Sequence, residues 1–116
     1  MNPYRGEHAI LIKDKTYTLK FDHNALVNIE QACDINLVYV MSDFQKNWRA
    51  HYTVKVLFYG LNGALSEEEI LEEVEKKGYM EYQPDIVQGL MLALAGTEAA
   101  KSVGEEGDKE PGKSLN

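Results

Sequence analysis

HAILIKDKTYTLKFD, residues 8–22, is the stretch of sequence that decides the fold. Apolar and polar side chains alternate through its second half, as they do when one face of a sheet is buried. The stretch therefore predicts a β-hairpin with strands at Ala9–Ile12 and Thr16–Phe21. The connection falls at Asp14-Lys15, and the absence of Gly after Asp leaves the turn type open. An isolated hairpin is only marginally stable in water, so its apolar face must pack on the helices that follow.

A first helix is predicted directly after the hairpin. Asp22 or Asn24 can cap it, and it runs to about Cys33, with apolar residues recurring at helical spacing. The apolar segment Asn36–Phe44 is ambiguous. By contrast, Trp48–Leu61 is long enough for a buried helix, and glycines at positions 60 and 63 offer its stop.

The clearest local signal is LSEEEI at residues 65–70. Ser66 can accept a hydrogen bond from the amide of Glu69, while the Glu69 side chain returns to the amide of Ser66. Together they form a capping box, and the flanking Leu and Ile form a hydrophobic staple. This helix is expected to end at Gly78.

A last helix begins near Pro84, a residue favoured in the first turn. One stripe of this helix is apolar and consists of Ile86, Val87, Leu90, Met91 and Leu94. A second line of small residues, where another backbone can approach closely, consists of Gly89, Ala93 and Gly96.

These elements predict an α+β, mostly helical fold in which an N-terminal β-hairpin packs on a small bundle of three to five helices. Residues 1–100 are expected to form a single domain. Residues 101–116 contain almost nothing apolar and are expected to be a disordered acidic and polar tail, since they cannot bury enough surface to offset chain entropy.

Composition narrows the class of function. The 116-residue chain has a net charge of −7, and residues 61–116 carry five Lys or Arg against thirteen Asp or Glu. No basic cluster suited to phosphates occurs, so we expect no nucleic-acid partner. No apolar run is long enough to cross a bilayer, so we expect no membrane partner. With one cysteine and no signal-peptide pattern, the chain is expected in the cytoplasm.

The sequence offers little for catalysis. Its three histidines, His8, His23 and His51, lack partners at metal-ligand spacing and are expected at the surface. Cys33 is expected in the core, and the glutamates of residues 67–75 are expected on a solvated helix face. We therefore predict neither an enzyme nor a cofactor.

Aromatic residues outside the expected core point instead to a protein partner, because such side chains bury much area at little entropic cost. Phe44 and Tyr59 are expected in the core, and Trp48 is open between core and interface. The candidate partner-binding residues are Tyr39, Trp48, Tyr52, Met80 and Tyr82.

An ordered series of motifs resembles the phage tail assembly chaperone family that is related to a gene transfer agent tail protein. The motifs are NPYRGE at residues 2–7, YTLKFD at 17–22, Asn24-Ala25-Leu26 with Ile29-Glu30, and the helix at 54–61 followed by LSEE at 65–68. The resemblance covers residues 2–96. The chain departs from the family pattern in two places. It has Lys15 where the family often has Gly, and it has a long C-terminal tail.

The resemblance implies a helper that binds the tape measure protein, keeps it soluble and helps recruit tail tube subunits. It implies action in the cytoplasm of the infected or lysogenic bacterial host and absence from the mature virion. The alternative is a minor structural tail or head-tail joining protein of the virion. A small regulator that binds a host protein is a third class, and homo-oligomerisation stays open.

Overall fold

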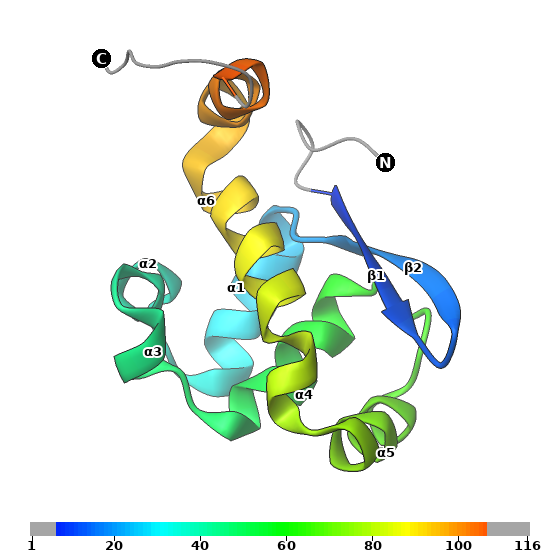
Figure 1. Ribbon diagram of the computed structural model, residues 1–116. Coiled ribbons are helices and arrows are strands. Elements are labelled where there is room, and N and C mark those ends of the chain that lie inside the picture. The colour runs from blue at the N-terminus through cyan, green and yellow to red at the C-terminus, as the bar shows by residue number, and fades with distance from the viewer. Residues whose placement is uncertain (1–6, 107–116) are drawn as a thin grey trace.

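The computed structural model describes the backbone of residues 7–106 and the side chains of residues 7–95. The elements in chain order are β1 (Glu7–Ile12), β2 (Lys15–Lys20), α1 (His23–Cys33), α2 (Leu37–Ser42), α3 (Phe44–Asn47), α4 (Ala50–Gly60), α5 (Glu67–Lys77), the 3-10 helix η2 (Tyr79–Tyr82) and α6 (Gln83–Glu106). The predicted hairpin on a bundle of helices is confirmed (Figure 1).

The described residues form six α-helices rather than three to five, because the ambiguous segment forms two short ones. Asn36 caps α2 by accepting from the amide of Tyr39. Asp43 then leaves helical geometry, with φ −149°, and its side chain caps α3. Each cap satisfies amides that a helix start leaves unpaired, so two polar residues cut an apolar run into two helices.

The hairpin turn is Lys13-Asp14, one residue earlier than the predicted connection at Asp14-Lys15, because Lys15 already pairs with Ile12 in the sheet. Both turn residues have positive φ, 55° and 63°, which is the type I′ geometry that the sequence left open. On the inner face of the hairpin, Ile10 and Leu19 are buried. The predicted alternation of buried and exposed side chains along the strands is confirmed. The first and last residues of each strand lie within two positions of the prediction.

Phe21 follows β2 and inserts between two helices at glycines. A Cβ at Gly60 of α4 would lie 2.6 Å from Phe21 Cε1, and one at Gly89 of α6 would lie 2.8 Å from Phe21 Cε2. Gly60 is the last residue of α4, where the sequence predicted the helix to stop, whereas the expectation that Gly89 admits another backbone is wrong. Both glycines make room for one aromatic ring, and the turn that follows α4 passes through Asn62 and Gly63, which have positive φ.

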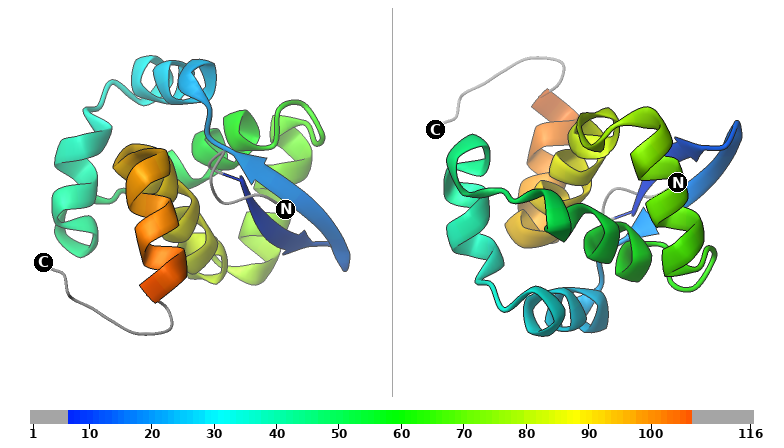
Figure 2. Two further views of the ribbon diagram at one scale, coloured as in Figure 1. Left: turned by 90° about the horizontal axis from the view of Figure 1, so that it is seen from above. Right: turned by 90° about the horizontal axis from the view of Figure 1, so that it is seen from below.

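Helix α6 is the central element of the molecule (Figure 1). It crosses the body with the hairpin on one side and α2 and α3 on the other, and both views of Figure 2 keep this order. A side-chain hydrogen bond of 2.8 Å between His8 Nε2 and Asp85 Oδ1 joins β1 to α6. His8 is half-buried, so its expected place at the surface is wrong, whereas His23 and His51 are exposed.

The predicted start of α5 is confirmed in detail. Ser66 Oγ accepts from the Glu69 amide at 3.1 Å, and the Glu69 carboxylate accepts from the Ser66 amide at 2.9 Å. The staple residues Leu65 and Ile70 are both buried. The hydrogen bond from the Ser66 backbone lowers the pKa of the Glu69 carboxyl below its ordinary value of 4.5.

Helix α6 departs from its prediction in two places. Ile86 and Leu90 are buried as expected, but Met91 is 49% exposed, so the buried stripe is narrower than predicted. The helix also continues to Glu106, past the point at which the tail was expected to begin. The rest of that predicted tail, residues 107–116, lies outside the described residues.

We expect Gly60→Ala to destabilise the fold by about 1–3 kcal/mol, because the added methyl group forces the Phe21 ring to move. In an unhindered helix the same change would stabilise by up to about 1 kcal/mol. Urea denaturation measures the difference, with the exposed Gln88→Ala on α6 as control. If Gly60→Ala is as stable as the parent chain or more stable, the ring does not need the space.

The capping box predicts a pH dependence. The Glu69 pKa is lower in the folded chain, so its stabilisation is complete above pH about 4.5 and is lost as the pH falls through the folded-state value. Glu69→Gln keeps a side chain that can accept the Ser66 amide but removes the titration. Thermal unfolding between pH 3 and 7 should show a shallower acid loss for this variant than for the parent. Parallel curves for the two proteins would contradict the assignment.

Candidate partner-binding surface

The structure separates the five predicted partner-binding residues. Met80 and Tyr39 are 76% and 65% exposed, and Tyr52 is partly buried against the core. Tyr82 is only 3% exposed and offers no contact surface, and Trp48, which the sequence left open between core and interface, is 9% exposed. Two of the five therefore offer a free side chain to a partner.

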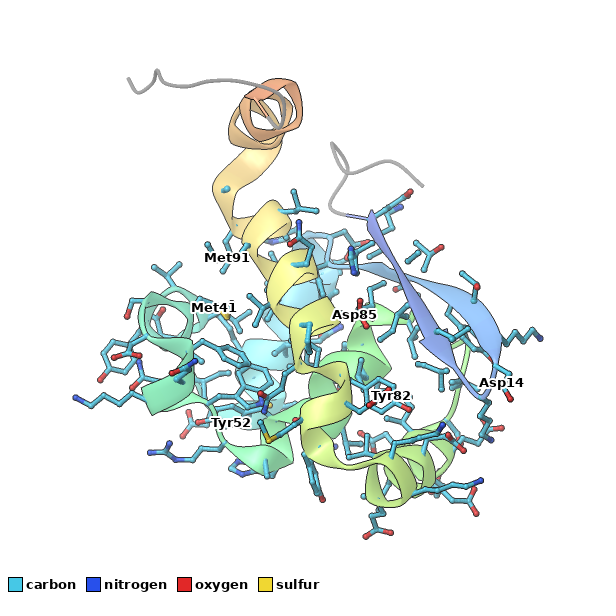
Figure 3. All side chains as sticks on the ribbon, in the orientation of Figure 1. Asp14, Met41, Tyr52, Tyr82, Asp85 and Met91 are labelled. Atoms are coloured by element: carbon cyan, nitrogen blue, oxygen red, sulfur yellow. The ribbon has the colours of Figure 1, made fainter. Side chains whose placement is uncertain are left out.

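Tyr82 ends η2 and belongs to the core. Burial is the main cause that raises the pKa of the Tyr82 phenol, and the negative charge of the nearby Glu73 carboxylate is the second. The phenol therefore stays protonated. In Figure 3 the labelled Tyr52 and Tyr82 side chains lie on opposite sides of the first turn of α6. The predicted set therefore does not form one continuous surface.

Trp48 is buried because its polar edge finds a partner inside the protein. Its Nε1 donates to Thr53 Oγ1 at 3.2 Å, across the start of α4. The Phe44 ring stacks on the indole with centroids 4.7 Å apart, and the Tyr52 ring meets its edge at 5.3 Å. This arrangement holds three aromatic rings in a row, which we call the aromatic row.

Part of the aromatic row forms one side of an open groove of about 460 Å³. We call it the aromatic groove, and it is lined by Phe44, Gln45, Trp48, Ala50, Tyr79, Met80 and Gln83. The walls come from α3 and the start of α4 on one side and from η2 on the other. An apolar side chain from another protein could insert here, with Met80 adapting its shape to the guest.

Sequence reasoning missed most of the groove. Phe44 was expected in the core, and Tyr79 was not among the candidate partner-binding residues. One available signal was the pair Tyr79-Met80 directly after the helix-ending Gly78, where neither residue can continue the stripe of α5. Nothing local indicates that this pair meets α3, because the two segments are far apart in the chain.

A second depression, of about 500 Å³, lies between the hairpin turn and α5. Its lining combines three lysines with three acidic residues, Lys13, Lys76, Lys77, Asp14, Glu72 and Glu73. These three positive and three negative side chains give the depression no net formal charge. The aromatic groove is the better candidate because its walls are largely apolar.

Tyr39 belongs to a different surface from the groove. It lies on α2 beside Val38, which is also exposed, and neither residue lines the groove. The Tyr39 carbonyl accepts from Asn47 Nδ2 at 3.1 Å, which fixes α2 against α3. The residue thus contributes to the placement of the groove wall through its backbone, while its ring faces solvent.

The chemistry-bearing side chains form no reactive constellation in residues 7–95. Cys33 is partly buried against the core, and this burial raises the pKa of its thiol, which disfavours the nucleophilic thiolate. No cluster of three or more His, Cys, Asp or Glu suited to a metal occurs among the described residues. Within the same part of the chain, no helix has the length and apolar character needed to cross a bilayer.

Comparisons with protein-family models, with curated proteins and with solved structures find no match for this chain. The aromatic groove and the motifs of the sequence are therefore the features that indicate a function.

The Trp48 to Thr53 hydrogen bond gives a testable contribution to stability. Thr53→Val leaves the buried indole N–H without its acceptor and should destabilise the fold by about 1–3 kcal/mol. Denaturation followed by the fluorescence of Trp48, the single tryptophan, measures the change directly. Thr18→Val on the exposed face of β2 is the matched control and should have little effect. Equal losses for both variants would contradict the role of this bond.

Proposed function

We propose that this protein is a phage tail assembly chaperone that binds the tape measure protein, keeps it soluble and helps recruit tail tube subunits to it. The observation that carries the proposal is the aromatic groove, with the exposed Met80 at its edge. The series of motifs that resembles the chaperone family supplies the identity of the partner.

The physical basis is the recognition of a helix by a groove. A long helical protein exposes apolar side chains at positions i, i+3, i+4 and i+7, and a partner covers them by offering a hydrophobic depression. Tyr, Trp and Met are the residue types enriched in such contacts. A groove of this kind holds one or two anchors, so several copies of the chaperone would be needed to cover a long tape measure helix.

The net charge supports the same role. At −7 the chain repels its own copies and keeps a coated complex dispersed. The acidic residues concentrate on α5, which begins with Glu67, Glu68 and Glu69, away from the groove lining. Solubility and partner binding are thus assigned to different faces.

Co-expression with the tape measure protein encoded by the same phage tests the proposal. The parent chain should raise the soluble fraction of that partner and be recovered in complex with it. Met80→Glu should reduce both towards the level seen without the chaperone, because it places a charge at the mouth of an apolar groove. Leu11→Glu is the control, since Leu11 is also exposed but lies on β1.

An unchanged soluble fraction with and without the parent chain would contradict the chaperone role. Mass spectrometry of purified particles separates it from the alternative. A chaperone is absent from finished virions, whereas a structural tail or head-tail joining protein is present in fixed copy number.

A further inference from the structure

The depression between the hairpin turn and α5 contains a buried carboxylate without a partner. We call it the charged depression, and its lining is Lys13, Asp14, Glu72, Glu73, Lys76 and Lys77. Five of these residues are exposed, whereas Glu73 is only 6% exposed. The Glu73 carboxylate has no hydrogen bond or ion pair among the described residues. Such a charge is costly, because burial removes the water that would otherwise solvate it.

The carboxylate of Glu73 opens into the charged depression. Among the described residues, no buried side-chain nitrogen or oxygen atom is sealed from solvent without a hydrogen-bond partner. The Glu73 oxygens have no partner, so they reach the surface, and the charged depression is lined by this residue. Ile70 and Val74 of the same helix belong to the core. Glu73 therefore lies at the edge of the core with its charged end towards the depression.

The neighbouring polar groups leave this carboxylate unsatisfied. Lys77 follows Glu73 by four positions, a spacing at which opposite charges on a helix can meet, yet the two form no ion pair. Lys13 and Lys76 line the same depression and form no ion pair with Glu73 either. The Tyr82 phenol has its pKa raised by burial and then by the Glu73 charge, but it makes no hydrogen bond to Glu73. A donor from outside the chain can therefore reach the carboxylate.

The charges of the lining select the class of ligand. A metal ion does not fit, since the described residues contain no group of three or more His, Cys, Asp or Glu suited to a metal. A simple anion meets the lysines but leaves Glu73 unpaired. A cationic N–H donor supplies what Glu73 lacks. A guanidinium is the best of these donors, because it is planar, is less strongly hydrated than an ammonium and gives a carboxylate two parallel hydrogen bonds.

We propose that the charged depression is a binding site for the guanidinium group of an arginine, with Glu73 as the acceptor of its hydrogen bonds. Asp14 and Glu72 offset part of the lysine charge at the same site, so a cation can enter. The volume of about 500 Å³ accommodates the head group and its stem. The site shares no lining residue with the aromatic groove, so the inference goes beyond the proposed function and is independent of it.

Small probes test this chemistry with the full, isotopically labelled chain. N-acetyl-arginine amide represents an arginine within a polypeptide, and N-acetyl-citrulline amide has the same shape without the charge. N-acetyl-lysine amide carries an ammonium instead. In nuclear magnetic resonance titrations the arginine probe should bind about tenfold more tightly than the citrulline probe, because its hydrogen bonds to Glu73 are charge-assisted. The amide shifts should change most in the hairpin turn and α5.

Two variants locate the contact. Glu73→Gln should weaken the arginine probe about tenfold, because the acceptor loses its charge. Without any probe, the same variant should unfold at a higher urea concentration than the parent chain, because a buried unpaired charge is removed. Glu72→Gln makes the same change at the adjacent exposed position and should have a smaller effect on both measurements. Circular dichroism verifies the folding of each variant.

Free L-arginine distinguishes the two sources of the group. Tighter binding of the acetylated amide assigns the guanidinium to a side chain of another protein. Tighter binding of free arginine assigns it to a small molecule whose carboxylate meets the lysines. Either result supports the site.

Absence of binding would overturn the inference, as would equal affinity for the arginine and citrulline probes or for the arginine and lysine probes. A Glu73→Gln variant less stable than the parent chain would also overturn it, since the carboxylate would then have a partner within the protein. The co-expression experiment measures a different surface. Its failure rejects the chaperone function and leaves this site standing, and failure of the titrations does the reverse.

Discussion

The ring of Phe21, held between Gly60 and Gly89, is the contact on which the arrangement of this protein depends. It lies where the hairpin passes into α1 and simultaneously touches α4 and α6, so one side chain fixes three parts of the chain relative to one another. Neither helix can carry a Cβ at the contact without displacing the ring. Close packing of this kind leaves little freedom for sliding, since protein interiors have few voids to absorb it.

The aromatic groove is a consequence of that arrangement. Gln83 begins α6, and the residues of η2 directly before it form one wall, while Trp48 and the start of α4 form part of the other. The position of α6 against α4 therefore sets the distance between the walls. The indole of Trp48, held by Thr53 and stacked on Phe44, gives the groove a rigid side, and the exposed Met80 gives it an adaptable one.

Charge is divided among the faces of the molecule. Helix α5 has three glutamates in its first turn. Their negative charges interact favourably with the positive end of the helix dipole and stabilise the helix. Lys55 neutralises one of them, Glu67, and ties α4 to α5.

The sequence alone determined the features that depend on neighbouring residues. The alternation in β2 and the reciprocal bonds of Ser66 and Glu69 are set within a few positions of the chain, and the cap of α1 is Asp22, one of the two candidates that the sequence offered. Only the tertiary structure decided which aromatic side chains are exposed. Trp48 is buried because its indole bonds to Thr53 and stacks on Phe44, and Met80 is 76% exposed because no element within the described residues covers it. Burial depends on what distant segments bring to a residue, and spacing along the chain does not contain that information.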